Sequence, residues 1–511
     1  MRRTFRSTVM LVVLSMVVTA CGTRLSEDDR ELVIAGLTGG GGGGGIVAPS
    51  EGVVTDGGET TDGTTSTDGG DTTGTTGGST AGTAGTTTGG TAGTAGTTTG
   101  GTDGGTGGTT GQAGTDTRAA PPGGNGGATD VGVTETEIVI YNVVDVGGVI
   151  QGLFEDARDA TQAYWAYFSS TEGTIYGRQI KYQFRDAGMS TQNNRSHYLE
   201  ACQNAFAAVG SMSAFEQGAA GPIKDCEKGP IPDIRTAAVS PEIQTLPTVI
   251  STDAMRPGQV PLSEWTYYKE VVGDEGVKKA GYLWINNATT SFQTQQNRDA
   301  TTKHLGYTWV EEIPIGLSET NYASIIQQLR SSDVQLVAFQ GDASQAIRLG
   351  EAMREQNWYP QLFGLQSNTY GQKLLDGMRD KAEELVSIYS VAQTGALVEE
   401  IQSNQEMQLY AEWLQRVKPG AKPTGLGLYA WASMKLFVDA VKAVGPNLTR
   451  AALVEELRKV NDFTANGLLP PQKIGEQIAT DCIIMLRIEG GQFVRAEPGN
   501  DYRCRPEPGF L

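Results

Sequence analysis

Histidine and cysteine are scarce in this 511-residue sequence, which contains two histidines and five cysteines. The only histidines are His197 and His304, and the cysteine spacings are not those of metal ligands. The GxSxG pattern is absent from the part of the chain that can fold, and no Ser-His-Asp arrangement has a recognisable context. We therefore expect no metal, no cofactor and no secreted hydrolase or other enzyme.

Positive charge is also in short supply. Lysine and arginine total 39 against 58 acidic residues, which leaves a formal net charge of −19. Nothing like a basic patch is present, and this argues against nucleic acid as a partner. The negative charge suits a secreted, soluble protein.

No apolar run is long enough to cross a membrane as a helix, and the longest run lies at the start of the chain. Arg2, Arg3 and Arg6 precede an almost wholly apolar stretch, Val9 to Val18. This stretch is shorter than the roughly 20 residues of a transmembrane helix. A charged start followed by a short apolar run is typical of a secretory signal, which indicates export.

The residues that end this run distinguish two kinds of signal. An ordinary cleaved signal peptide is one interpretation. However, "VTAC", Val18 to Cys21, resembles the bacterial lipobox, which implies a signal peptide at 1–20 and lipid on Cys21. Several acyl chains, at about 0.8 kcal/mol per buried CH2, anchor a protein stably. We predict a lipid-anchored protein on the extracytoplasmic face of the cell membrane, with residues 21–37 as its tethered N-terminus.

Residues 38–130 consist mainly of Gly, Thr, Ala, Ser and Asp. An 11-residue unit, "TAGTAGTTTGG", occurs at 80–90 and again at 91–101, and it has no apolar face that could stack. We predict a disordered linker with a mean span of about 50 Å. When stretched, it would reach roughly 300 Å. Such a reach indicates work beyond or within a thick wall, as in a Gram-positive or actinobacterial cell.

Four cysteines remain for the folded part: Cys202, Cys226, Cys482 and Cys504. An even number in an oxidising compartment indicates disulfides, with three possible connectivities. Buried free thiols are the alternative. Local pairing, Cys202 with Cys226 and Cys482 with Cys504, closes loops that are each worth roughly 3.5 kcal/mol. We predict these two local bonds.

From residue 137 onward, short apolar strands alternate with amphipathic helices. "EIVIYNVV", "GYLWINN" and "VQLVAFQGD" are examples of strands that end abruptly in polar residues. This alternation predicts an α/β fold with parallel sheets flanked by helices. "CIIMLRIEGGQFVRA" predicts a hairpin turning at Gly490 and Gly491. Ligands of such sheets bind at the carboxyl ends of the strands.

The ordered series "TIYGRQIKYQFRDAG", "AAVGSMSA", "RTAAVSPEI", "KKAGYLWINN" and "GLGLYAWASMKLFVDAV" resembles the type 1 periplasmic binding proteins. The most similar group is the branched-chain amino acid binding proteins of ABC transporters. The resemblance implies two α/β lobes joined by three crossovers, with a ligand in the cleft between them. We place the solute-binding domain at 131–511, with lobe one at about 131–256 and 393–466 and lobe two at about 257–392 and 467–511.

The resemblance also implies the site. In lobe one the positions that hold a ligand carboxylate are Ser211, Ser213 and Ser240, helped by backbone N–H groups. The alternative is that these serines only cap helices. In lobe two the candidates that follow strands are Asn286, Asn287, Gln340, Asp342 and Gln366.

Gln366 departs from the pattern of the amino acid binders, in which a Glu at this position takes the ammonium group. A neutral amide offers no charge-assisted bond. We therefore expect plain branched-chain amino acids to bind weakly, unless Asp342 takes over the role. Trp284, Phe292 and Tyr370 are candidates for lining the cleft, although core packing is the favoured place for Trp284.

These residues lead to one main functional hypothesis. A lipid-anchored solute-binding protein captures a small polar organic ligand, which is amino-acid-like, an amide or an aromatic, and hands it to an ABC permease. The alternatives are a ligand-sensing receptor of the same fold that signals to a membrane partner, and a wall-spanning stalk whose folded head binds protein.

Overall fold

A computed structural model describes residues 117–378, 388–392, 397–497, 499, 502–505 and 509–510. Cys21, the signal segment and residues 38–116 of the predicted linker lie outside the described residues. The described residues belong to one compact unit, Gly114–Leu511.

The first sheet has the strand order β2-β1-β3-β4-β5, and every neighbouring pair is parallel. Its strands are β1 (Glu137–Val144), β2 (Gln179–Asp186), β3 (Ala207–Val209), β4 (Asp233–Ala237) and β5 (Val249–Asp253). Every residue of β3 and β4 is buried. Central parallel strands are covered on both faces, and β3 is accordingly wholly apolar, whereas β4 also buries Asp233, Arg235 and Thr236.

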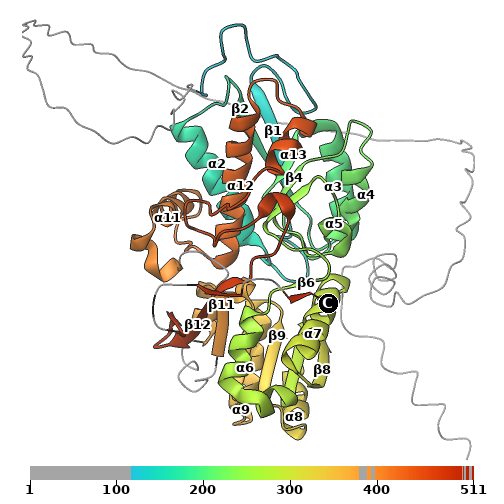
Figure 1. The fold of residues 1–511 in the computed structure, drawn as a ribbon, viewed down its shortest axis with the longest axis vertical. Coiled ribbons are helices and arrows are strands. Elements are labelled where there is room, and N and C mark those ends of the chain that lie inside the picture. The colour runs from blue at the N-terminus through green and yellow to red at the C-terminus, as the bar shows by residue number, and fades with distance from the viewer. Residues whose placement is uncertain are drawn as a thin grey trace, which may run out of the picture. The chain divides into compact units, whose positions relative to one another are not determined.

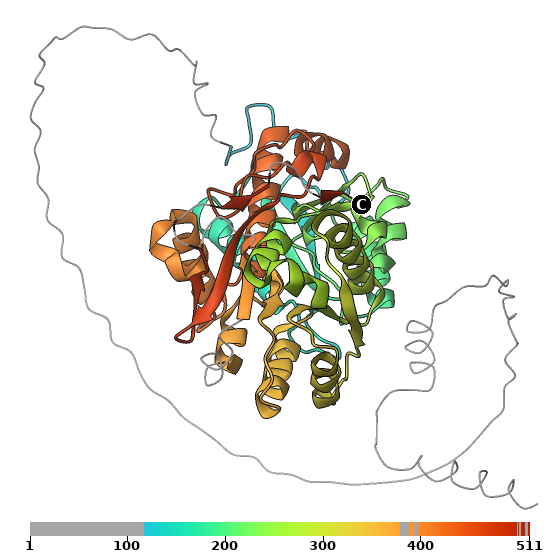
Figure 2. The same cartoon turned by 60° about the horizontal axis from the view of Figure 1, so that its bottom comes forward.

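The second sheet has the order β13-β12-β11-β10-β9-β7-β8. It consists of β7 (Ala280–Ile285), β8 (Trp309–Ile315), β9 (Leu336–Gln340), β10 (Leu362–Leu365), β11 (Ile388–Ala392), β12 (Cys482–Glu489) and β13 (Gln492–Arg495). β7 to β11 are parallel, whereas β12 and β13 are antiparallel and form one edge of the sheet (Figure 2). The predicted hairpin is confirmed, because Gly490 and Gly491 link these two strands with φ angles of 59° and 73°.

Helices flank both sheets (Figure 1). Around the first sheet lie α2 (Glu155–Thr171), α3 (Thr191–Asn204), α4 (Ala220–Lys224), α5 (Pro241–Gln244), α11 (Gln405–Val417), α12 (Gly425–Val444) and α13 (Arg450–Leu457). Around the second lie α6 (Ser263–Gly276), α7 (Ala288–Leu305), α8 (Tyr322–Ser331), α9 (Ala343–Glu355) and α10 (Gln372–Met378). Short 3-10 helices are η1 (Glu216–Ala219), η2 (Val277–Lys279), η3 (Ser367–Thr369), η4 (Val398–Ser403) and η5 (Ile474–Glu476).

Helix α12 anchors the first lobe. Fourteen of its residues are buried, and it packs against α2, where Trp431 meets Tyr164 with ring centroids 4.8 Å apart. Thr424 begins this helix by accepting a hydrogen bond from the N–H of Gly427. Gly425 and Gly427 therefore form the first turn of a buried helix.

The chain crosses between the lobes three times, after β5, after β11 and before β12. The first and third crossings are joined by hydrogen bonds, since Ser263 N–H donates to Asp481 Oδ1 at 2.7 Å. The first crossing also contains β6 (Gln259–Val260), which pairs with the C-terminal strand β15 (Gly509–Phe510). The predicted two-lobed α/β fold with parallel sheets and three crossovers is confirmed, while the residue limits of the lobes stay a prediction.

Residues 117–130 show where the predicted linker must be shortened. Arg178, only 1 % exposed, donates to the carbonyls of Asn125 and Gly127. The Asn125 side chain in turn donates to the carbonyls of Glu135 and Tyr176. A buried guanidinium needs acceptors, and this end of the Gly-rich segment supplies them. Composition alone does not reveal these contacts.

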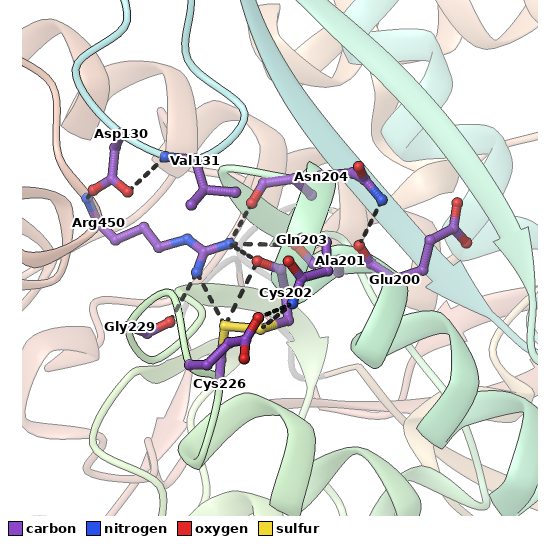
Figure 3. The surroundings of a disulfide bond; sticks show 12 residues. Asp130, Val131, Glu200, Ala201, Cys202, Gln203, Asn204, Cys226, Gly229 and Arg450 are labelled. Carbon is purple, nitrogen blue, oxygen red and sulfur yellow. Dashed lines mark hydrogen bonds between the residues drawn. A yellow bond between two sulfur atoms is a disulfide. The ribbon is translucent and has the colours of Figure 1, made fainter.

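Both predicted disulfides are formed. Cys202 joins Cys226, and Cys482 joins Cys504 of the short strand β14 (Arg503–Cys504), which pairs with β12. Beside the first bond, Arg450 reaches the carboxyl end of α3 (Figure 3). Its guanidinium donates to the carbonyls of Ala201, Cys202 and Ala205, at the end of a helix where carbonyls lack some of their helical partners. Burial lowers the pKa of Arg450, and these carbonyls compensate for its loss of solvent.

Candidate ligand-binding site

A cavity of about 210 Å³ lies between the two lobes, with walls from both. Lobe one contributes Thr236 and Ala237 at the end of β4 and Asp253 at the end of β5. Lobe two contributes residues at the ends of β7, β9 and β10. The cavity therefore lies at the carboxyl ends of strands, where open α/β sheets bind ligands.

Four predicted lobe-two residues line this cavity, namely Asn287, Gln340, Asp342 and Gln366, whereas Asn286 is exposed and does not. Asn287 and Asp342 also begin helices. Asn287 Oδ1 accepts from the N–H of Thr290 at 2.9 Å, and Asp342 Oδ1 accepts from the N–H of Ser344 at 2.7 Å. Helix capping thus fixes both side chains at the cavity wall.

The side-chain amide of Gln340 forms hydrogen bonds with three other side chains. Its Oε1 accepts from the hydroxyls of Tyr282 at 3.3 Å and Thr294 at 3.1 Å, while its Nε2 donates to Gln293 Oε1 at 2.6 Å. Gln293, Gln296 and Asn297 of α7 extend this amide-rich wall. Such preorganised polar groups orient a ligand at small entropic cost.

The predicted serines of lobe one face inward instead. Ser211, Ser213 and Ser240 are buried, and none of them lines the cavity. Ser213 Oγ donates to Asp145 Oδ2 and accepts from Asn194 Nδ2, both at 2.8 Å. Ser211 Oγ accepts a long bond of 3.4 Å from the N–H of Val143. Ser240 precedes α5 without a side-chain cap.

Two of the protein's own carboxylates, Asp145 and Glu216, form hydrogen bonds with the loops that carry these serines. Asp145 Oδ2 accepts from the N–H of Ala214 at 2.8 Å. Glu216 Oε1 accepts from the N–H groups of Val239 at 2.7 Å and Ser240 at 2.6 Å. Burial raises the pKa of both acids, and the hydrogen bonds they accept oppose that rise. The backbone donors expected for a ligand carboxylate therefore already have partners.

Four charged side chains line the cavity: Asp253, Arg256, Glu264 and Asp342. Burial raises the pKa of Asp253 to about 7. Burial also raises the pKa of Glu264 to about 7, although the Tyr268 hydroxyl, 2.8 Å from its Oε1, opposes the rise. The sequence analysis missed Asp253, Arg256 and Glu264, even though Asp253 is the polar residue that ends a buried strand.

A family comparison decides what kind of protein carries this cleft. A family model described as periplasmic binding protein matches residues 137–492. The chain belongs to the periplasmic binding protein family. Members of this family bind substrates and are not enzymes, which confirms both the resemblance to type 1 periplasmic binding proteins and the expected lack of catalysis. No curated protein sequence matches the chain.

Solved structures show the same fold for this periplasmic binding protein. A fatty acid ABC transporter substrate-binding protein from Thermomonospora curvata has a TM-score of 0.60 at 18% identity, covering 72% of this chain and 93% of its own. The Streptococcus pneumoniae branched-chain amino acid binding protein with isoleucine scores 0.57 at 14%, covering 70% and 98%. An R. palustris solute-binding protein with 4-hydroxybenzoate scores 0.59 at 13%, covering 73% and 98%.

The aromatic candidates of this periplasmic binding protein lie outside the cavity wall. Trp284 Nε1 donates to Ser291 Oγ, and Tyr370 packs edge-on against Phe493 with centroids 4.8 Å apart. Phe292 is half-buried in α7. The aromatic residues that do line the cavity are Phe154, Trp265 and Tyr429. Trp265 and Tyr429 lie within helices, so a search restricted to the residues that follow strands does not find them.

Proposed function

We propose that this chain captures a small polar organic solute outside the cytoplasm and delivers it to an ABC permease. The observation that carries the proposal is the cavity lined by both lobes of a periplasmic binding protein. Structural neighbours bound to isoleucine and 4-hydroxybenzoate, and one described as a fatty acid transporter component, support a cleft of this fold as a solute site.

The mechanism of ligand capture follows from the presence of contact residues on both lobes. A solute that touches Asp253 of lobe one and Asn287 or Asp342 of lobe two gains all its contacts only when the lobes approach each other. Ligand therefore shifts the population toward the closed form. The permease can then recognise closure rather than the solute itself.

Solute capture is tested by denaturing protein purified from its native host and identifying the released small molecules by mass spectrometry. We expect one organic solute in roughly equimolar amount. Import is tested by uptake of that solute in a strain lacking the gene. Unchanged uptake would contradict import and favour the receptor alternative, and a protein that neither releases nor binds any solute would contradict the proposal itself.

We further propose a lipid anchor at Cys21. This position lies outside the described residues, and the proposal rests on the lipobox-like "VTAC". Within the described part of the chain, no helix has the length and apolar character to cross a bilayer. The anchor would hold the protein to the membrane surface through its acyl chains.

Replacing Cys21 by alanine is expected to move the protein from the membrane fraction to the medium, or to leave it unprocessed. The thiol is the only lipidation site that the motif provides. Fractionation with immunoblotting measures the change, and Ser26→Ala, a substitution outside the lipobox-like motif, is the control that keeps the anchor. A Cys21→Ala protein that is cleaved and still sediments with membranes would contradict the anchor.

A further inference from the structure

The unpartnered polar atoms in the cavity wall are hydrogen-bond acceptors. Gln244 and Asp342 are each 6 % exposed, and neither Gln244 Oε1 nor Asp342 Oδ2 has a partner among the described residues. Gln244 Nε2 donates to the carbonyl of Ala238 at 2.9 Å, which leaves its oxygen without a partner. A buried acceptor without a donor costs free energy, so a ligand that brings donors would be favoured here.

Asp253 adds a charged acceptor. Within the part of the chain that the structure describes, its carboxylate has no hydrogen bond and no ion pair, and burial is the only cause of its raised pKa. Glu264, at the start of α6, accepts a single hydrogen bond, from Tyr268. Both residues are half-buried. A carboxylate that has lost part of its water and has no counterion is unfavourable, and a cation beside it lowers that cost.

Positively charged donors for an anion are few in the same wall. Asp145 and Glu216 accept the N–H groups of Ala214, Val239 and Ser240. Among the described residues of the wall, Arg256 is the one cationic side chain, and it is exposed. The electrostatic preference of the cleft is therefore opposite to that of a site that grips a ligand carboxylate.

We propose that the cleft selects an organic cation, a solute whose ammonium-type group contacts Asp253, Glu264 or Asp342 and which needs no carboxylate. The proposal rests on the proposed solute-binding function. A protonated amine carries N–H donors and no acceptor, which matches the free acceptors, whereas a quaternary ammonium group brings the positive charge alone. Trp265 and Tyr429 line the same wall, and aromatic rings attract cations.

A metal ion is a poorer match. Among the described residues, no group of three or more His, Cys, Asp or Glu side chains is arranged to hold one. Asp253 ends β5 of the first sheet, whereas Glu264 in α6 and Asp342 after β9 lie beside the second sheet. Acids placed on both lobes suit a cationic organic solute that favours closure.

The test uses purified full-length protein in mild detergent and isothermal titration calorimetry. The cations are 3-methylbutylamine and choline, and their uncharged isosteres are 3-methylbutan-1-ol and 3,3-dimethylbutan-1-ol. The anion 3-methylbutanoate and the zwitterion leucine complete the panel. We expect at least one cation to bind tenfold or more tightly than its isostere, and tighter than 3-methylbutanoate or leucine.

Asp342→Asn is the decisive variant, because asparagine still caps α9 while the charge is removed. We expect the affinity for the cation to fall tenfold or more, with the affinity for its neutral isostere unchanged. The matched control is Asp333→Asn, a 75 % exposed acid of the same lobe that pairs with Lys279 and lies outside the cavity wall. This control should leave both affinities unchanged.

The outcomes separate this inference from the proposed function. If the anion, the zwitterion or a neutral isostere binds at least as tightly as its cation, the inference is overturned and solute binding stands. Binding by no cation of the panel also overturns it, and the mass spectrometry of released solutes then decides on the proposed function. Equal losses in Asp342→Asn and Asp333→Asn would equally contradict a role for Asp342 in the site.

Discussion

Replacing Arg235 by methionine is expected to lower the stability of lobe one by about 3–5 kcal/mol, the usual cost of removing one partner of a buried ion pair. Arg235 Nη2 lies 2.6 Å from Glu216 Oε2, and its Nη1 lies 2.7 Å from Asp233 Oδ2. All three side chains are completely buried. The variant keeps a chain of similar length but leaves two carboxylates without a counterion.

The effect should extend to the cavity. Glu216 also accepts the N–H groups of Val239 and Ser240, and Val239 lines the cavity wall. In the native protein, the positive charge of Arg235 opposes the rise that burial causes in the pKa of Glu216. Loss of Arg235 is therefore expected to raise this pKa further. A protonated Glu216 would hold this loop less firmly, so ligand affinity should fall together with stability.

Thermal unfolding measures the first effect, and we expect Tm to fall by roughly 10 °C. The matched control is Lys278→Met, since Lys278 pairs with Glu275 and both side chains are more than half exposed. Exposed pairs of this kind contribute about 0–1 kcal/mol. If Arg235→Met unfolds at the same temperature as Lys278→Met, the buried cluster is not the main support of this loop.

The sheets and the hairpin could be predicted because local patterns determine them. Apolar runs such as Leu336–Gln340 become central parallel strands, and a Gly-Gly pair with positive φ closes β12 onto β13. The rule that strand ends carry the site also placed Gln340 and Gln366 in the cavity wall. The prediction of the strands and the prediction of the residues that follow them both depend only on residues that are adjacent in the sequence.

The lobe-one side of the site could not be predicted, because it depends on contacts between residues far apart in the chain. Ser213 meets Asp145, 68 positions away, and Ser240 N–H meets Glu216 from another loop. The motifs "VGSMSA" and "AAVSPE" contain the serines but not the acids that engage them. Similarly, Asn125 lies in Gly-rich sequence and owes its fixed place to Arg178.

The affinity of the cleft for a cation is expected to fall as the pH falls below 7. In the ligand-free protein, burial holds the pKa values of Asp253 and Glu264 at about 7. An adjacent cation favours the carboxylate and lowers these pKa values in the complex. Below pH 7, binding must therefore release a proton from Asp253 or Glu264 wherever either contacts the cation, and above pH 7 that requirement disappears.

Linkage gives the size of the change. For each carboxyl that must ionise, the affinity should drop roughly 20-fold between pH 7.5 and pH 5.5. A primary amine, with a pKa near that of lysine, stays cationic over this range, and so does choline. Other ionisable groups face Asp253 and Glu264 from the packed elements and the cavity wall, namely Arg256, Tyr268, Tyr282, Tyr307, Asp342, Tyr429 and Asp481.

Calorimetric titrations at pH 5.5, 6.5, 7.5 and 8.5 measure this dependence for the cation of the panel that binds. Its neutral isostere is the control, and its affinity should not change with pH. Asp253→Asn should remove one proton from the linkage and flatten the profile, while Glu264→Gln should remove the other. An affinity for the cation that stays constant or rises between pH 7.5 and 5.5 would show that neither carboxyl contacts it, because a buried acid with a pKa near 7 must lose its proton before it can act as a counterion.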